Sequence, residues 1–269
     1  FVRGDIGDQV LVTKLLNEHQ PRAIVNFAAE SHVDRSIDDP TEFVKTNIVG
    51  TFNLLECSRE YWNGLQDDQK KNFRFHHIST DEVYGSLLPT APAFTETHPY
   101  KPNNPYSASK AASDHLVRAW FHTHGFPVVT THCSNSYGPY HFPEKLIPLM
   151  ITNALEGKPL PVYGDGKQVR EWMYVYDNVG VIIDLMFDPK VINEVYNIGS
   201  GVHHTNMEII KMIGDILGEE VKIKHVPDRL GHDRKYSLHR LKLLSYYRAK
   251  DISLECLDLQ EFLLNLYKK

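Results

Sequence analysis

A hydroxyl and two neighbouring carboxyl groups follow a short apolar run in the first third of the chain. The segment Ser79–Gly85 contains Thr80, Asp81 and Glu82, and it comes directly after Phe75–Ile78, which is predicted to form a buried strand. Two carboxyl groups in different environments can act as acid and base in one reaction. Most carboxylates lie solvated in surface turns, so it is the position behind a strand that makes these two candidates for catalysis.

A phenol and an ammonium group lie four residues apart later in the chain, at Tyr106 and Lys110. The proline before the tyrosine predicts the start of a helix, on which both side chains share one face. Because a nearby ammonium favours the phenolate, we expect Lys110 to lower the pKa of the Tyr106 phenol toward neutral pH. The spacing alone is not specific, since it recurs at Tyr163/Lys167 and Tyr246/Lys250.

The elements that must position these groups alternate between apolar strand-like runs and helical patterns. This alternation predicts an α/β fold with a doubly wound, Rossmann-like parallel sheet that has helices on both faces. In such a sheet ligands bind beyond the carboxyl ends of the strands, which is where Ser79–Gly85 falls. The predicted strands are 23–27, 75–78, 128–131 and 195–198, and the predicted helices are 40–62, 105–124, 145–156 and 174–187.

A change of composition after Cys133 toward proline, glycine and tyrosine predicts a second, smaller mixed α/β domain. We assign 1–133 plus about 174–198 to a dinucleotide-binding domain, and about 134–173 plus 199–269 to a substrate domain. Residues 238–251 show no pattern that predicts an element. No G-x-G-x-x-G turn occurs and the chain does not begin with methionine, so we expect the natural protein to supply the first strand and its glycine-rich turn before Phe1.

Composition and charge narrow the class of protein. Hydrophobic residues make up 42% and charged residues 23% of the 269 residues, as in ordinary globular domains. A net charge of -5 gives no electrostatic reason to expect a nucleic-acid or membrane partner, and no apolar run is long enough to span a bilayer. Three scattered cysteines predict reduced thiols in a cytoplasmic protein. No metal site is expected, because the histidine pairs are adjacent and no HExxH or CxxC occurs.

Seven motifs in order along the chain resemble those of the extended short-chain dehydrogenase/reductase family, and within it the dehydratases that act on sugar nucleotides such as dTDP-glucose. Acidic residues at both 81 and 82 are the discriminating feature, since related epimerases usually carry small residues there. The matching segments are 28–36, 46–51, 79–85, 105–110, 133–139, 142–148 and 228–234.

The resemblance implies conversion of dTDP-glucose to dTDP-4-keto-6-deoxyglucose with bound NAD. It implies that Tyr106 takes the proton of the 4-hydroxyl while Thr80 hydrogen-bonds that oxygen and hydride leaves C4. Glu82 would then remove the C5 proton and Asp81 would protonate the departing 6-hydroxyl, before hydride returns to C6. The order is physically required, because a C5–H is a very weak acid until the neighbouring ketone exists. Lys110 completes the implied catalytic set.

The resemblance also implies binding residues and a homodimer that pairs through helices 40–62 and 105–124. Three further enzyme or protein classes remain open: a sugar-nucleotide 4-epimerase, a decarboxylase, and a catalytically silent NAD-fold binding protein. The implied cofactor contacts are Asp5, Ile6, Phe27, Ala28, Ala29, Thr46, Tyr106, Lys110 and Ser136. The implied substrate contacts are Ser31, Thr80, Asn135, Lys145, Leu146, Pro161, Tyr163, Arg170, Asn206, Arg229 and His232. In a chain of these 269 residues alone, the missing glycine-rich turn is expected to impair NAD binding.

Overall fold

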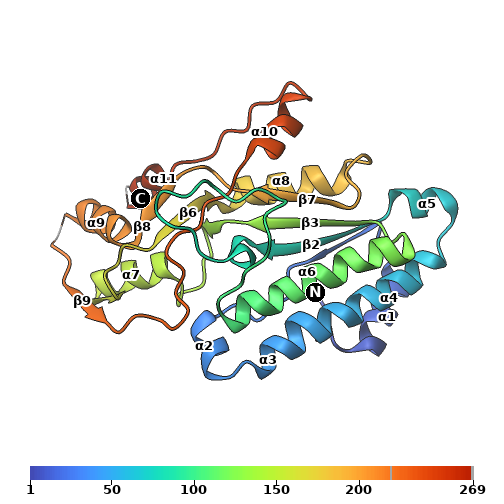
Figure 1. Ribbon diagram of the computed structural model, residues 1–269, viewed down its shortest axis with the longest axis horizontal. Helices are drawn as coiled ribbons and strands as arrows, with labels where there is room; N and C mark the ends of the chain where they lie inside the picture. The colour runs from blue at the N-terminus through green and yellow to red at the C-terminus, as the bar shows by residue number, and fades with distance from the viewer. Residues whose placement is uncertain (219, 268–269) are drawn as a thin grey trace. The chain divides into compact units, whose positions relative to one another are not determined.

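The structure is a computed structural model that describes residues 1–218 and 220–267. It divides into two compact units, each built from separate stretches of the chain (Figure 1). The first unit comprises Phe1–Tyr84, Pro99–His132 and Ile182–Tyr196, and the second comprises Gly85–His98, Cys133–Val181 and Asn197–Lys269. The stretch Gly85–His98 therefore groups with the second unit, although its position in the sequence suggested the first.

A four-stranded sheet in the order β1-β2-β3-β7 forms the centre of the first unit (Figure 1). Strand β1 runs parallel to β2 with Asn26 opposite His77, so the residues that follow both strands leave the sheet at the same edge. The predicted parallel α/β arrangement is confirmed. The strands are β1 (Ala23–Asn26), β2 (Arg74–Thr80), β3 (Val128–Cys133) and β7 (Glu194–Ile198).

Helices α1 (Gln9–His19), α4 (Thr51–Asn63) and α6 (Pro105–His124) pack together in this unit. Helix α6 has the predicted bounds, because both ends carry strong signals. The side chain of Asn104 accepts a hydrogen bond from the Ser107 amide at 2.9 Å, and Gly125 ends the helix with φ 67°. An apolar core fills the space between these helices and the sheet: Val12, Leu16, Leu54, Leu55, Cys57, Phe73, Phe75, Val117, Phe126 and Val128.

The predicted helix over 40–62 is present but not uniform. It consists of α3 (Thr41–Phe43), a π-helical segment η1 (Val44–Gly50) and α4, and the short helix α2 (Val33–Asp38) precedes it. π-helical turns are rare and often mark functional positions. Here the segment turns Asn47 inward, where its side chain bonds both backbone groups of Glu30, at 2.8 Å and 3.0 Å.

The second unit has two small sheets and a separate apolar core. One sheet has the order β4-β6-β8 and the other pairs β5 with β9 in parallel. Strand β4 lies inside the stretch rich in proline and glycine, where no strand was predicted, and α10 occupies the stretch that showed no pattern. The elements are β4 (Asn135–Tyr137), α7 (Leu146–Leu155), β5 (Leu160–Tyr163), β6 (Val169–Tyr174), β8 (His203–Thr205), α9 (Asn206–Leu217), β9 (Ile223–Val226), α10 (Leu241–Arg248) and α11 (Leu259–Tyr267). Helix α8 (Val175–Phe187) begins in this unit and continues into the stretch of the first unit that starts at Ile182.

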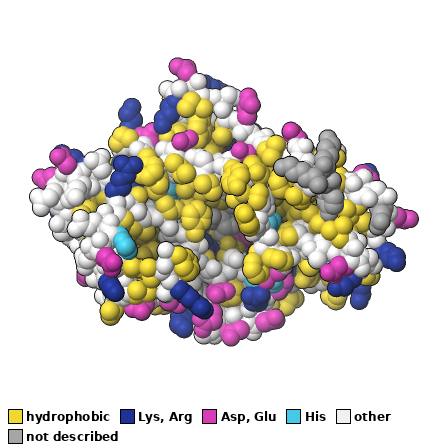
Figure 2. Space-filling model, turned by 180° about the vertical axis from the view of Figure 1, so that it is seen from behind, with side chains coloured by type: hydrophobic (Ala, Val, Ile, Leu, Met, Phe, Trp, Pro, Cys, Tyr) yellow, Lys and Arg dark blue, Asp and Glu magenta, His cyan; other side chains and the backbone are white. Residues whose placement is uncertain are grey.

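The surface carries charges of both signs. On the face drawn in Figure 2, basic and acidic side chains are interspersed among hydrophobic ones, and this face has no extended basic patch. That distribution agrees with the modest net charge of -5. None of the helices in the described part of the chain is long and apolar enough to cross a membrane.

Candidate active site

The hydroxyl and the two carboxyl groups lie at the carboxyl end of β2, as predicted. Thr80 ends the strand, and Asp81 and Glu82 begin the short 3-10 helix η2 (Asp81–Tyr84). The Thr80 hydroxyl donates to Asp81 Oδ1 at 3.3 Å and accepts from the Glu82 amide at 3.3 Å. Asp81 is buried whereas Glu82 is half-buried, so the two neighbouring carboxyl groups have different surroundings.

Tyr106 lies in the first turn of α6, close to those carboxyl groups. Burial raises the pKa of its phenol far above the usual value, and the charges of Glu82 and Asp81 raise it further. A hydrogen bond with the Thr80 side chain acts in the opposite direction. The expected lowering of this pKa by Lys110 is wrong for this state of the protein, because burial and two nearby carboxylates outweigh any favourable charge.

Lys110 lies one turn along α6 from Tyr106 and is buried. Its Nζ donates to the backbone oxygen of Ile78 in β2 at 2.8 Å. The ammonium is thus held against the strand that ends in Thr80. Together the strand end and the first turns of α6 bring the five predicted catalytic residues into one region of the first unit: Thr80, Asp81, Glu82, Tyr106 and Lys110.

Most predicted cofactor residues also lie in the first unit, in two places. Phe27, Ala28 and Ala29 follow β1 at the edge of the sheet where Thr80 ends β2, and the Phe27 side chain is 59% exposed. Thr46 lies in the π-helical segment η1. In doubly wound sheets a dinucleotide binds at the carboxyl ends of the strands. This edge of the sheet is therefore a suitable place for a dinucleotide cofactor.

The other cofactor residues, Asp5 and Ile6, form a tight turn before α1. Asp5 Oδ1 accepts from the Gly7 amide at 2.7 Å, and the Ile6 backbone oxygen accepts from the Asn53 side chain at 2.6 Å. A Cβ placed on Gly50 would lie 2.9 Å from Ile6 Cγ1, so the end of η1 and this turn approach each other closely. Ser136 belongs to β4 of the second unit, where its hydroxyl accepts from Asn178 at 2.9 Å.

Within the second unit, Tyr163, Arg229 and His232 come together. The Arg229 guanidinium carbon lies 5.0 Å from the centre of the Tyr163 ring, and the His232 ring contacts the same tyrosine edge to face at 6.1 Å. His232 Nδ1 lies 2.6 Å from Asp228 Oδ1. Burial lowers the pKa of His232, and the positive charges of Arg170 and Arg229 lower it further. Both guanidinium groups therefore disfavour a positive charge on this imidazole.

The Arg170 guanidinium is fixed beside this cluster. It donates to the backbone oxygen of Asp233 at 3.0 Å, and its carbon lies 4.2 Å from the centre of the Tyr236 ring. Planar guanidinium groups of this kind suit recognition of phosphate oxygens. The remaining predicted substrate residues occupy element ends or edges: Ser31 after β1, Asn135 in β4, Lys145 and Leu146 at the start of α7, Pro161 in β5 and Asn206 at the start of α9.

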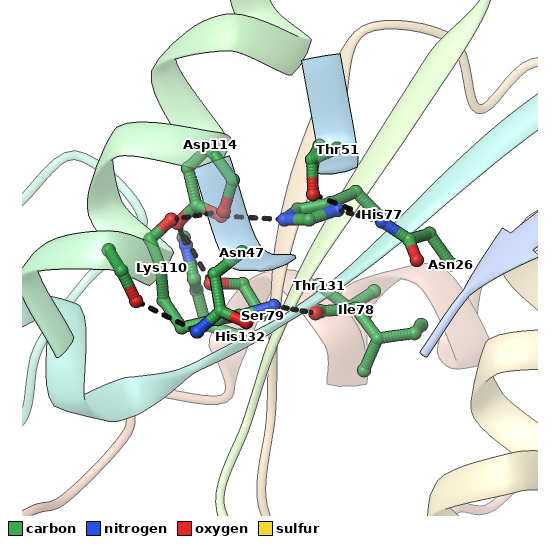
Figure 3. Close-up of polar contacts among 12 residues, drawn as sticks. Asn26, Asn47, Thr51, His77, Ile78, Ser79, Lys110, Asp114, Thr131 and His132 are labelled. Carbon is green, nitrogen blue, oxygen red and sulfur yellow. Dashed lines mark hydrogen bonds and ion pairs between the residues drawn. The ribbon is translucent and has the colours of Figure 1, made fainter. Parts of the chain in front are cut away.

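Sequence reasoning missed a buried polar network beside the catalytic residues (Figure 3). Asp114, one turn beyond Lys110 on α6, faces His77 and Ser79 of β2 and His132 of β3. Helical spacing from Lys110 and the alternation of His77 and Ser79 along the strand were the available signals. His77 and its neighbour His76 do face opposite ways, since His76 contacts Thr131 instead at 3.1 Å.

Among the described residues, no group of three or more histidine, cysteine, aspartate or glutamate side chains is arranged to hold a metal ion. Cys57, Cys133 and Cys256 form no disulfide; Cys57 is buried, and Cys133 and Cys256 are half-buried.

Comparison with known proteins gives consistent matches. A family model described as GDP-mannose 4,6 dehydratase matches residues 1–262. The dTDP-glucose 4,6-dehydratase of Xanthomonas campestris pv. campestris (strain B100) is 57% identical over 253 residues, which cover 90% of this chain and 72% of that protein.

Solved structures agree with the sequence matches. DesIV, a dTDP-glucose 4,6-dehydratase from Streptomyces venezuelae with NAD bound, superposes with a TM-score of 0.88 at 41% identity, covering 100% of this chain and 78% of its own. The UDP-glucose 4-epimerase of Thermus thermophilus in complex with NAD superposes with a TM-score of 0.86 at 27% identity, covering 99% of this chain and 83% of its own. The dehydratase is thus the more similar of these two in sequence, although both share the fold.

Proposed function

This chain belongs to the GDP-mannose 4,6 dehydratase family, and within that family we propose that it is a hydro-lyase that converts dTDP-glucose to dTDP-4-keto-6-deoxyglucose with NAD as its cofactor. The observation that carries this proposal is the pair of adjacent carboxyl groups, Asp81 and Glu82, at the end of β2 and within electrostatic reach of Tyr106. The 57% identity to a dTDP-glucose 4,6-dehydratase supports the same substrate and reaction.

Residues of the first unit would hold NAD at the edge of the sheet. Phe27, Ala28, Ala29 and Thr46 would line the cofactor, and Asp5 and Ile6 would contact its adenine end. When bound, NAD supplies the acceptor and later the donor of a hydride. Tyr106 and Lys110 would orient the nicotinamide end together with the substrate, since both project from the helix that faces the end of β2.

The side chains of the chain itself would move the protons. Tyr106 would accept the proton of the 4-hydroxyl once its own phenol has lost its proton, and the Thr80 hydroxyl would hydrogen-bond the same oxygen. Formation of the 4-ketone acidifies the C5–H, which Glu82 removes. Asp81 donates a proton to the departing 6-hydroxyl, so that water leaves, and Glu82 later returns its proton to C5. The contrast between buried Asp81 and half-buried Glu82 supports this division between acid and base.

The second unit would bind the nucleotide part of the substrate. Arg170 and Arg229 suit the diphosphate, and the Tyr163 ring offers an apolar face beside Arg229. Asn135, Lys145, Leu146, Pro161, Asn206 and His232 would complete this surface, and Ser31 of the first unit would contact the sugar. Ser136 is proposed to contact the cofactor.

The reaction class is tested by mass analysis of the product. The protein is incubated with dTDP-glucose, and in parallel with UDP-glucose. We expect loss of one water from dTDP-glucose with no net NADH, and much slower conversion of UDP-glucose. A product of unchanged mass would indicate an epimerase, and absence of any product from either substrate would leave a decarboxylase or an NAD-binding role.

A second copy of the chain is the proposed partner, through the surface formed by η1, α4 and α6. Three apolar side chains, Val44, Val49 and Phe52, are 49%, 53% and 46% exposed there, and Phe52 stacks edge to face on Trp120 of α6. Apolar side chains gathered on one surface commonly mark interfaces. Phe52→Asp is expected to shift sedimentation from dimer to monomer, whereas Leu88→Asp, at an exposed leucine of the other unit, is not.

A further inference from the structure

The carboxylate of Asp114 is buried and is used by none of the steps above. Ser79 Oγ donates to its Oδ2 at 2.9 Å, and His132 Nε2 lies 3.0 Å from the same oxygen. His77 Nε2 lies 3.3 Å from Oδ1. Figure 3 shows this carboxylate turned from α6 toward the ends of β2 and β3. All of these residues belong to the first unit.

The charges in this network follow from its contacts. Hydrogen bonds from His132 and His77 outweigh burial and hold the pKa of Asp114 well below its usual range, so the group is a carboxylate at neutral pH. Burial, together with the charge of Lys110, lowers the pKa of His77 to about 4, so this imidazole is neutral. Its Nε2 lies 3.3 Å from Asp114 Oδ1, and its Nδ1 accepts from Asn26 Nδ2 at 3.4 Å.

Three consecutive residues of β2 are tied to α6 through these contacts. His77 and Ser79 contact Asp114, and Ile78 between them accepts from Lys110 at 2.8 Å. Thr80, Asp81 and Glu82 follow Ser79 directly, and Tyr106 projects from the first turn of the same helix. The position of the carboxyl groups relative to the phenol therefore depends on how this strand is held against this helix.

The network also reaches the predicted cofactor segment. Asn26 contacts His77 through its amide nitrogen and accepts from the Ala28 amide through its oxygen at 3.1 Å. Asn47 of η1 donates to Ser109 of α6 at 2.8 Å. Hydrogen bonds thus connect the segments after β1 and β2 with the helix that carries Tyr106.

We propose that Asp114 is a positioning residue of the reaction: through Ser79 and His77 it fixes Thr80, Asp81 and Glu82 at their working distance from Tyr106. The proposal rests on the proposed dehydratase function. A misplacement of about 1 Å between reacting groups can cost about a hundredfold in rate, so even a small shift of the strand end has a kinetic effect. A shift of the strand end slows C4 oxidation and water elimination together, because Thr80 serves the first and the carboxyl groups serve the second.

The test is a double-mutant cycle in the protein with bound NAD. Ser79→Ala and Asp114→Asn are made singly and together, and turnover of dTDP-glucose is measured per folded molecule. We expect Ser79→Ala to lower kcat about tenfold with little change in KM, equivalent to about 1.4 kcal/mol. In the Asp114→Asn background the same change is expected to cost less than about twofold, because the shared contact is already lost. Single-turnover NADH traces should show both chemical steps slowed.

Ser58→Ala is the matched control, because Ser58 is also buried and its hydroxyl bonds a backbone oxygen of its own helix at 2.5 Å. It should leave kcat unchanged. If Asp114→Asn does not fold, the kcat of Ser79→Ala alone still tests the positioning role. A kcat within about twofold of the parent, or a loss of stability without a loss of kcat, would overturn the positioning role. A parent protein that does not dehydrate dTDP-glucose would instead contradict the proposed function.

Discussion

Burial separates two carboxyl groups that are adjacent in the sequence. Asp81 is 2% exposed at the start of η2, whereas its neighbour Glu82 is half-buried and receives no such enclosure. Burial disfavours a charged carboxylate, so an enclosed group is better suited to hold a proton for a leaving hydroxyl. The more open neighbour is better suited to act as the base. This contrast gives the two side chains separate roles that can be tested one at a time.

Asp81→Asn should slow elimination far more than C4 oxidation. The amide cannot protonate the 6-hydroxyl, and loss of a general acid commonly costs about a hundredfold or more in rate. Rapid mixing with dTDP-glucose should therefore show enzyme-bound NADH forming at nearly the parent rate and then decaying slowly. Asp67→Asn, at an exposed residue of α5 (Asp67–Asn72), should change neither phase. If Asp81→Asn slowed both phases equally, Asp81 would not be the general acid of the elimination step.

Arg229 is expected to act on substrate affinity rather than on chemistry. Its guanidinium lies over the Tyr163 ring, and a guanidinium group binds phosphate oxygens well. Arg229→Ala should raise KM for dTDP-glucose about tenfold while kcat changes little, because a lost charge-assisted hydrogen bond weakens binding of the ground and transition states alike. Steady-state kinetics measure the split. Arg248→Ala, at an exposed arginine of α10, should leave both constants unchanged.

At the scale of elements, the π-helical segment η1 changes what its helix can contact. It places Asn47 against Glu30 and Ser109, and it ends at Gly50, beside Ile6. A regular helix through the same residues would present a different set of side chains to the helix α6. The irregular turn is therefore part of how the segment after β1 is held.

Gly50→Ala tests that close approach. The added methyl would lie 2.9 Å from Ile6 Cγ1, so the Ile6 side chain in the turn before α1 has to shift. We expect NAD affinity to fall several-fold, measured by fluorescence titration of the apoprotein. Gly180→Ala in α8 is the matched control, because a methyl there has open space and should stabilise the helix by about 0.5–1 kcal/mol without affecting NAD. Equal NAD affinity of Gly50→Ala and the parent would show that the turn at Asp5 and Ile6 does not contribute to cofactor binding.

Strong local signals made some elements predictable and left others hidden. Pro105 and Gly125 mark both ends of α6, and its bounds agree with the prediction. No such signal marks η1, because a π turn depends on the contacts of Asn47 rather than on helical periodicity. Strand β4 is short and is held by its pairing with β6, which lies much later in the sequence. Its proline- and glycine-rich surroundings gave no sign of a strand. Tertiary contacts decided these elements.

The residues of the candidate site were likewise predictable only in part. Motif residues such as Thr80, Asp81 and Tyr106 were found from their order in the chain, and the fold brings them together. Asp114 was not found, because its four-residue spacing from Lys110 is a common helical pattern, and only the structure shows that His77 and His132 face it. The direction of the Tyr106 pKa shift also needed the structure, since it depends on burial and on carboxylates from another element.

At the scale of the molecule, two buried histidines couple folding to pH. Burial lowers the pKa of His76 to about 3 and that of His77 to about 4, against about 6.5 for an exposed imidazole. Below pH 6.5 the unfolded chain binds protons that the folded chain does not, so the free energy of unfolding falls as the pH drops. Asp114 also lowers the free energy of unfolding as the pH drops below about 4, because its pKa in the folded state is depressed as well.

Urea unfolding between pH 7.5 and about pH 4 should therefore show a steep loss of stability below about pH 6.5. His76 alone should contribute about 3 kcal/mol by pH 4, because that pH lies roughly 2.5 units below the unfolded pKa and each unit is worth about 1.4 kcal/mol. His76→Gln keeps a group able to bond Thr131 but removes the titration, so its stability should depend less on pH in this range even if it is lower at neutral pH. His122→Gln, at an exposed histidine of α6, should keep the full slope. An unchanged slope in His76→Gln would mean that this imidazole is not held neutral in the folded chain.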